Sequence, residues 1–472
     1  MKLSKSLAFS IGPIGGAALA LITLPIVAWL FSPEDIGRLT MLQVTVSFSL
    51  LLFSFGLDQA YIREFHEVKD KLGLLKSVFI PGFTILLFFL VGLVFSPWSP
   101  SLLLFGIDSL FLTFLLYAVI LLSFGSRFLS LILRMQERGL AFSMSQVLPK
   151  LLFLLIMLGF VRLEAEAVFD NLIMANFISL LAVFVIYAWN TRKDWLPALT
   201  AKIDKSKQSQ MIRYAIPLIG GGLAFWGLTT MDKFFLRSMS GFQELGIYSV
   251  AVTFAGAALV FQSIFSTIWI PLVYKWAAND EVNALVIKSV VDHVTLAVVI
   301  IWSLTGVCSW LIVYILPPAY LSVPLILLAT IAYPLLYTLA DASSVGIGIK
   351  RKTIYSLLAA ILALVANAVG NWFLIPKFGA SGAAMASAIA FFLYFFFVTE
   401  ASSLLGMSFE RWRMYSFIIV LIVLSLVFNT IALDGITLVV LSYLVVLLAS
   451  LFVFKRQLLE GSDFFIKKLL KK

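Results

Sequence analysis

Two cations lie inside segments that are otherwise apolar enough to cross a membrane, and a third lies just beyond the end of one. Lys150 falls near the middle of segment 141–161, Lys233 lies near the outer end of segment 214–236, and Arg237 follows Lys233 by one helical turn, just past that end. A charge near the centre of a bilayer costs roughly 3 kcal/mol or more unless it faces water or a counter-ion. Like charges one turn apart repel, and an anion between them would relieve that repulsion. These residues predict a positively lined cavity suited to a phosphate or diphosphate group, while Lys233 and Arg237 are also placed to reach water by snorkelling at the outer boundary.

Polar side chains recur at helical spacing in several of these segments. The stripes contain Gln43, Ser47, Ser54 and Asp58; Ser143, Gln146 and Lys150; Trp226, Thr230, Lys233 and Arg237; Gln262 and Ser266; Thr330, Tyr337 and Asp341; and Asn367 and Asn371. Inside a bilayer such side chains need partners or water. Each stripe therefore indicates either a cavity lining or hydrogen bonds between packed helices, and the sequence leaves both interpretations open.

The elements that position these residues are membrane spans. At 62% hydrophobic and 12% charged residues, the chain has too few polar side chains to cover the surface of a soluble domain. About 20 apolar residues in a helix cross a bilayer. We predict an all-α polytopic membrane protein with fourteen transmembrane helices, at about 7–31, 41–62, 75–95, 107–126, 141–161, 168–189, 214–236, 246–272, 290–315, 323–347, 354–374, 381–404, 414–432 and 436–454.

Basic residues alternate across these spans. Of the 34 Lys and Arg residues, 28 lie at the N-terminus or on even-numbered connections, 4 lie on the other side, and Lys150 and Lys233 lie within spans. The positive-inside rule then predicts that both termini are cytoplasmic. Because these residues face the anionic cytoplasmic leaflet, the net charge of +10 does not indicate nucleic-acid binding. The single Cys308 excludes an internal disulfide, and two scattered histidines do not suggest a metal site, so we expect neither metal nor cofactor.

The two halves of the chain repeat one another. Segment 32–48 matches segment 241–257 in its loop, its glycine and the helix that follows, and the spans before them carry GPIGG at 12–16 and IPLIGGG at 216–222. Six spans per copy give both copies one orientation about a pseudo-two-fold axis along the membrane normal, as in transporters with parallel repeats. The Pro and Gly residues fit a hinge or simple relief of helix packing. We predict an N-lobe at 1–190, a cytoplasmic linker at 191–213, a C-lobe at 214–405, a helical hairpin at 406–454 and a cytoplasmic amphipathic tail at 455–472.

Three aspartates are candidates for coupling such transport to an ion gradient. Asp58 and Asp341 each end a polar stripe, and Asp232 adjoins Lys233. A gradient is expected because the chain has no GxxxxGK loop that would cradle the phosphates of ATP. Asp58 and Asp341 also lie close enough to the cytoplasmic boundary to be simple interfacial residues.

Several motifs resemble the polysaccharide transporter family, the flippases for O-antigen and other lipid-linked oligosaccharides in the MATE-like superfamily. The matching segments are LFSPEDIGRLTMLQ at 30–43, FGLDQAYIREF at 55–65, MDKFFLRSMSGFQELGIYSVA at 231–251 and IPKFGASGAAMASAIA at 375–390. The resemblance implies two six-helix lobes in the inner membrane of a bacterium or archaeon. These would move a polyprenyl-diphosphate-linked glycan to the outer leaflet by alternating access, among membrane lipids and beside glycan polymerase or chain-length proteins.

The family's aspartate and cation pair in the seventh span maps to Asp232 and Lys233, and its acidic and arginine pair in the second span maps to Asp58 and Arg63. The chain departs from a symmetrical two-cation site, because Leu364 stands where the second lobe would match Lys150.

Other functions compete with this interpretation. A lipid II flippase differs only in its glycan. A MATE-type cation-coupled multidrug antiporter would hold a carboxylate near the midplane of an N-lobe helix, and the first span has none. A membrane glycan polymerase or ligase would need catalytic groups on substantial outer loops, which here are short and hold little beyond Glu34, Asp35, Glu164 and Glu166. We therefore expect that the chain is not an enzyme.

Overall fold

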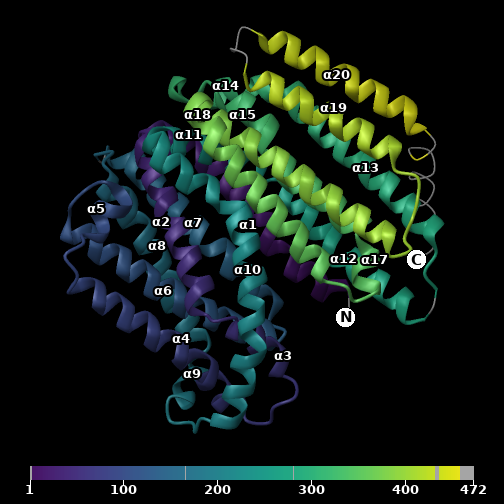
Figure 1. The fold of residues 1–472 in the computed structure, drawn as a ribbon. Coiled ribbons are helices and arrows are strands. Elements are labelled where there is room, and N and C mark those ends of the chain that lie inside the picture. Colours follow the sequence, from purple (N-terminus) through teal and green to yellow (C-terminus); the bar gives the residue numbers. More distant parts are fainter. Residues whose placement is uncertain (1–2, 165, 280, 431–434, 456, 458–472) are drawn as a thin grey trace. The chain divides into compact units, whose positions relative to one another are not determined.

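A computed structural model of the chain describes residues 3–164, 166–279, 281–430, 435–455 and 457. Within these residues every regular element is a helix, as Figure 1 shows. A helix bonds its backbone N–H and C=O groups internally, which a segment in hydrocarbon requires. The predicted all-α class is thus confirmed, whereas the amphipathic tail predicted at 455–472 lies almost wholly outside the described residues.

The first half of the chain supplies ten helices of the described part. They are α1 (Leu3–Leu30), α2 (Pro33–Phe53), α3 (Leu57–Glu64), α4 (Lys71–Val94), α5 (Pro100–Phe105), α6 (Leu110–Met135), α7 (Gly139–Leu163), α8 (Phe169–Asn190), α9 (Arg192–Ala198) and α10 (Lys205–Met239).

The second half continues with shorter and longer elements. They are α11 (Gly241–Ala255), α12 (Ala258–Ala278), α13 (Ala284–Cys308), η1 (Ser309–Leu311), α14 (Ile312–Ile315), η2 (Pro318–Tyr320), α15 (Val323–Thr330), α16 (Ala332–Ser343), α17 (Val345–Ile349), α18 (Ile354–Leu404), α19 (Trp412–Phe428) and α20 (Ile436–Val453).

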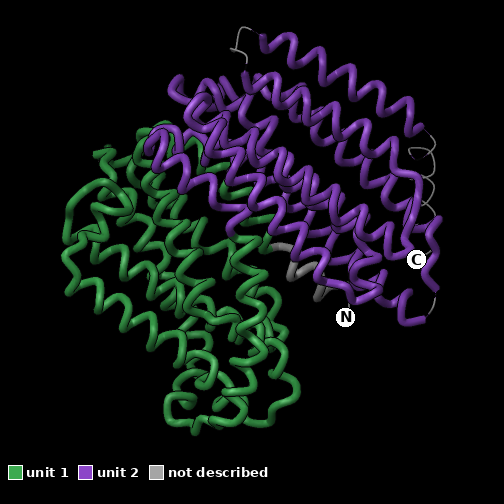
Figure 2. The backbone as a smooth tube through the Cα atoms, viewed as in Figure 1, with its two compact units in different colours: residues 1–226 green, residues 227–472 purple. Residues whose placement is uncertain are grey.

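The chain forms two compact units, which Figure 2 colours separately. Unit 1 comprises residues 1–226 and unit 2 comprises residues 227–472. The boundary falls inside α10, so the linker predicted at 191–213 lies wholly in unit 1. The finer division into lobes, linker and hairpin stays a prediction.

Twelve helical stretches of the described part are long and apolar enough to cross a membrane. One of them, α18, is 51 residues long and holds a non-helical glycine between two arms, and α19 is apolar but has only 17 residues. Each of the fourteen predicted ranges overlaps a helix, while the count of fourteen spans stays a prediction.

The bend in α18 depends on a glycine. Gly379 has φ 53° and ψ −127°, a conformation that residues with a Cβ rarely adopt. The carboxylate of Glu244 on α11 accepts a 2.8 Å hydrogen bond from the backbone N–H of Ala380, which caps the second arm. At Gly382 an added Cβ would collide with the carbonyl of Leu374, so the two arms approach closely because this residue is small.

Four predicted spans are interrupted rather than continuous. Segment 41–62 breaks between α2 and α3, where Phe55 and Gly56 both have positive φ. Segment 246–272 divides into α11 and α12, segment 290–315 into α13, η1 and α14, and segment 323–347 into α15, α16 and α17. The prediction that Gln43 and Asp58 share one helical arc assumed an unbroken helix, and it is wrong for that reason.

Candidate functional site

Lys150 lies near the middle of α7, where the sequence placed it within a span. Its Nζ donates a 2.9 Å hydrogen bond to the backbone carbonyl of Gly16 on α1, and its side chain remains exposed. A carbonyl oxygen is a dipole and not a counter-charge, so the positive charge is held in place without being neutralised. The ammonium is therefore positioned within unit 1 and remains able to meet an anion.

The stripe that contains Lys150 faces α1. At Gly12 an added Cβ would lie 3.1 Å from Gln146 Oε1 and 3.1 Å from the Cα of Ser143, and at Gly16 it would lie 3.4 Å from Lys150 Nζ. Ser143 is fully buried and Gln146 is half-buried. The glycines of α1 thus serve close packing against α7, which is one of the two interpretations that the sequence left open for the Pro and Gly residues.

The glycines of α10 differ from those of α1. Among the described residues, no atom lies within 4 Å of a Cβ built at Gly220 or Gly221, whereas one at Gly222 would lie 3.1 Å from Leu51. Close packing therefore accounts for Gly222 and leaves Gly220 and Gly221 unexplained.

Asp58 is paired with an arginine that the sequence did not suggest. Its carboxylate accepts a 2.6 Å hydrogen bond from Nη2 of Arg127 on α6. The arginine that the family resemblance paired with it, Arg63, instead lies over the ring of Tyr214, with its Cζ 4.4 Å from the ring centroid. Asp58 is buried and Arg127 is partly exposed, so the pair joins α3 to α6 at one end of unit 1.

The polar residues of α2 present one exposed face. Gln43 and Ser47 are both exposed, and the indole N–H of Trp226 donates a 3.1 Å hydrogen bond to Ser47 Oγ. The ring of Trp226 also packs on Phe48, with centroids 4.9 Å apart. Two of the predicted cavity residues, Ser47 and Trp226, are thus in contact although they are far apart in the sequence.

Asp232 is the centre of a buried network in unit 2. Its carboxylate accepts hydrogen bonds from Tyr248 Oη at 2.6 Å, from Asn371 Nδ2 at 2.8 Å and from Ser387 Oγ. These donors come from α11 and from both arms of α18. Three donors from three helical segments thus meet at one carboxylate.

The network extends to Asn367, which the sequence placed on a polar stripe. Asn371 Nδ2 also donates to Asn367 Oδ1 at 3.0 Å, and Asn367 Nδ2 donates to Ser387 Oγ at 3.4 Å. Asn367 and Asn371 have no exposed surface, so in this structure Asn367 belongs to the buried network, and a cavity-lining role for it stays a prediction. Asn371 Oδ1 is buried and has no hydrogen-bond partner among the described residues.

The two outer cations occupy different environments. Lys233 is half-buried and lies beside the charge of Asp232. Arg237 lies over the ring of Phe242, with its Cζ 4.5 Å from the centroid. Both are described within unit 2 and Lys150 within unit 1, so a joint cationic site remains a prediction.

Asp341 meets another predicted residue. Gln262 Nε2 on α12 donates a 3.0 Å hydrogen bond to Asp341 Oδ2 on α16. Close by, the rings of Tyr337 and Tyr394 stack with centroids 6.0 Å apart. The sequence placed Tyr337 and Asp341 on one polar stripe and Gln262 on another, and it gave no sign that α12 and α16 would bring Gln262 and Asp341 together.

The described part of the chain has twelve candidate membrane spans and a fold similar to those of MurJ and of MATE transporters. The lipid II flippase MurJ in an inward closed conformation is 15% identical, with a TM-score of 0.66 over 97% of this chain and 100% of that one. An inward-facing multidrug resistance MATE family transporter of the MOP superfamily is 15% identical, with a TM-score of 0.55 over 84% and 96%. A mutant of the Vibrio cholerae MATE transporter VcmN is 14% identical, with a TM-score of 0.52 over 86% of this chain and 97% of that one. These likenesses confirm the predicted MATE-like fold.

The sequence itself shows the family. The model of the polysaccharide biosynthesis protein family matches residues 3–276, and the chain belongs to this family. No curated protein sequence matches it. The resemblance that the motifs indicated is thereby confirmed.

Proposed function

We propose that this protein is a flippase that moves a polyprenyl-diphosphate-linked oligosaccharide, an O-antigen or exopolysaccharide repeat unit, from the inner to the outer leaflet by alternating access. Family membership supports a role in polysaccharide biosynthesis. Twelve candidate membrane spans and a MurJ-like fold support a transport role rather than an enzymatic one. The substrate, the plasma-membrane location and the cytoplasmic termini are parts of the same proposal.

The observation that carries the proposal is the environment of Lys150. An exposed ammonium halfway along α7, held by a carbonyl and not by a carboxylate, is costly in a lipid-facing position. If Lys150 lines the path of the substrate, the negatively charged diphosphate supplies a counter-ion for its ammonium. Lysine suits a passing phosphate because it is a flexible point charge.

The coupling ion would act on an aspartate that can change its charge. Asp58 is tied to Arg127, and the carboxylate of Asp232 is occupied by three hydrogen-bond donors. Asp341 accepts its 3.0 Å bond from the neutral amide of Gln262. We therefore assign proton coupling to Asp341, while Asp232, beside the unpartnered Asn371 Oδ1, is the alternative for a metal cation.

The direct test is a flipping measurement with the purified chain in proteoliposomes. A fluorescent polyprenyl-diphosphate oligosaccharide should change leaflet faster than in protein-free vesicles, and the acceleration should respond to an imposed proton gradient. Vesicles that show no acceleration with any polyprenyl-diphosphate substrate would refute the proposal.

A lipid II flippase is the second candidate, because lipid II carries the same polyprenyl diphosphate. The MurJ-like fold does not decide between the two, since it is shared at only 15% identity. A competition experiment distinguishes the two candidates. In a mixture of both lipids, an O-antigen or exopolysaccharide precursor should be moved in preference to lipid II. Export of cationic drugs with no lipid movement would point to a MATE-type antiporter instead.

A further inference from the structure

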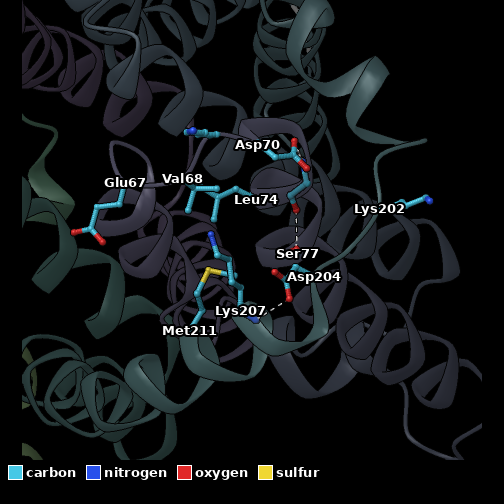
Figure 3. A pocket seen from close by; sticks show the side chains of 11 residues that line it. Glu67, Val68, Asp70, Leu74, Ser77, Lys202, Asp204, Lys207 and Met211 are labelled. Carbon is cyan, nitrogen blue, oxygen red and sulfur yellow. Dashed lines mark hydrogen bonds between the residues drawn. The ribbon is translucent and has the colours of Figure 1, made fainter.

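A cavity of about 360 Å³ lies at one end of unit 1, apart from the residues discussed above. Figure 3 shows that its lining comes from the loop before α4, the first turns of α4, the connection into α10 and the first turns of α10. The lining residues are Glu67, Val68, Lys69, Asp70, Gly73, Leu74, Ser77, Lys202, Asp204, Lys207 and Met211.

Hydrogen bonds between residues far apart in the sequence hold the walls of this cavity together. Lys76 Nζ on α4 donates to the carbonyls of Leu199 at 2.6 Å and Ala201 at 2.9 Å. Gln208 Nε2 on α10 donates to the carbonyl of Ser77 at 2.9 Å. These hydrogen bonds fix the connection that leads into α10 to α4, so the fold of unit 1 itself defines the space between them.

Two carboxylates in the lining are occupied as helix caps. Asp70 Oδ1 accepts from the N–H of Gly73 at 2.9 Å, and Asp204 Oδ1 accepts from the N–H groups of Ser206 at 3.0 Å and Lys207 at 3.1 Å. The N-terminus of a helix carries a partial positive charge of roughly half a unit, so α4 and α10 offset much of these two negative charges.

The remaining charges in the lining favour an anion. Lys69, Lys202 and Lys207 are exposed around the cavity and supply three positive charges. The one opposing charge is that of Glu67, the only lining carboxylate in the described part that caps no helix. All of them lie on the side that the distribution of Lys and Arg predicts to be cytoplasmic, where anionic lipids attract basic residues.

The cavity also has an apolar wall. Val68, Leu74 and Met211 contribute it, and Leu74 and Met211 are each only 5% exposed. A small inorganic ion would leave this wall uncovered, whereas a headgroup followed by a glycerol and the start of an acyl chain would cover it.

We propose that this cavity binds a phosphate-bearing anion, with its phosphate held by Lys69 and Lys207 and with Lys202, whose side chain points away from Lys207 in Figure 3, adding positive charge at the rim. The source is an anionic phospholipid of the inner leaflet or a free phosphate compound. The apolar wall favours the lipid. A bound headgroup bridges α4 and the connection into α10, the helix that begins in unit 1 and ends in unit 2, and so strengthens the fastening that Lys76 and Gln208 already make. This inference does not depend on what the protein transports.

The test measures lipid binding by the purified full-length chain with native mass spectrometry. The charge variant is Lys69→Gln with Lys202→Gln and Lys207→Gln. Its matched control is Lys275→Gln with Lys350→Gln and Lys352→Gln, which removes three exposed cations of the same predicted side but far from the cavity in sequence. We expect phosphatidylglycerol to bind the wild type in preference to phosphatidylcholine. The charge variant should lose roughly tenfold in affinity and the control less than about twofold.

Two further measurements separate the lipid, the free phosphate and diffuse charge. Val68→Trp fills part of the cavity without changing its charge, and should weaken phosphatidylglycerol binding while the control lysine variant does not. If inorganic phosphate raises the melting temperature of the wild type but not of the charge variant, and phosphatidylglycerol shows no preference, the source is a free phosphate. If the charge variant and the control are indistinguishable with both probes, the proposal is wrong.

Discussion

The hydroxyl of Tyr248 on α11 donates a 2.6 Å hydrogen bond to the carboxylate of Asp232 on α10, inside unit 2. Asn371 and Ser387, from the two arms of α18, donate to the same carboxylate. Asp232 thus ties the end of α10 to α11 and to the bend of α18. Hydrogen bonds to a charged acceptor are stronger than those between neutral groups, so this carboxylate is part of what holds unit 2 together.

The variant Asp232→Asn should destabilise the protein by about 2 to 4 kcal/mol, because an amide offers one acceptor oxygen where three donors now meet two. Tyr248→Phe removes one donor and should cost only about 1 kcal/mol. Glu410→Gln, which breaks the exposed pair with Lys288, is the control and should change little. Denaturation in detergent followed by tryptophan fluorescence measures all three. Equal stability of Asp232→Asn and wild type would show that the network is dispensable.

The sequence predicts the class of this fold much better than the network around Asp232. Apolar run lengths and alternating charges are local signals, and each predicted range overlaps a helix, although α6 ends at Met135 against a predicted 126 and α10 begins at Lys205 against a predicted 214. Asn371 and Ser387, in contrast, lie 139 and 155 residues from Asp232, and no local pattern pairs them with it. The sequence shows the helical spacing of Asn367 and Asn371. It does not show their role, because polar residues that line a cavity and polar residues that form hydrogen bonds in a buried core have the same spacing.

The breaks in predicted spans show a second limit. Gly56 has positive φ inside the predicted span 41–62, yet nothing in its apolar surroundings distinguishes it from the helical Gly220. Gly379, in contrast, lies in the connection that the sequence predicts between 354–374 and 381–404. The partner of Asp58 was missed for a related reason. Arg63 is one turn away in the sequence, whereas Arg127 comes from α6 and is brought in only by the tertiary fold.

We predict that Gly379→Ala lowers stability by about 1 to 3 kcal/mol, because alanine must adopt φ 53° and ψ −127° there. Its Cβ would also lie against Glu244 Oε2, the cap of the second arm of α18. Gly220→Ala is the matched substitution inside a helix with no neighbour in the way, and it should raise stability by about 0.5 to 1 kcal/mol. Urea or thermal unfolding of both variants checks this, and equal effects would argue against the bend at Gly379.

The same Gly220→Ala variant distinguishes a hinge from passive flexibility in α10. A hinge predicts that flipping slows although the protein is more stable, since the helix resists bending. Unchanged flipping at higher stability would rule out a hinge at this position.

Asp341→Asn should abolish the response of flipping to an imposed proton gradient and leave folding largely intact, because an amide can still bond to Gln262 but cannot release a proton. Asp58→Asn should keep the gradient response and lose stability instead, since Arg127 is left without its partner. Proteoliposomes with the fluorescent substrate and a set pH difference provide the measurement. A gradient response that survives in Asp341→Asn and disappears in Asp58→Asn would reverse the assignment.

The predicted topology can be tested by cysteine labelling, because the chain has a single native cysteine to remove. In a Cys308→Ser background, a cysteine at Glu166 should react with a membrane-impermeant maleimide added outside intact cells, and one at Ser206 should react only after the cells are opened. Both positions are exposed. Labelling of the Ser206 position from outside would overturn the arrangement with cytoplasmic termini.

Lys150→Gln should reduce flipping roughly tenfold or more at equal abundance, because a charged hydrogen bond to a passing phosphate contributes about 1.5 to 3 kcal/mol. Glutamine can still donate to Gly16, so packing of α7 on α1 should be kept and the protein should insert normally. Lys150→Arg keeps the charge and should retain much of the activity, although its planar group follows a phosphate less freely. Lys193→Gln removes an exposed cation outside any predicted span and is the control. The readout is leaflet exposure of the lipid-linked glycan in cells that lack the wild-type protein. If Lys150→Gln flips as fast as wild type, the ammonium only fastens α7 to α1, and the cationic path for the diphosphate must be abandoned.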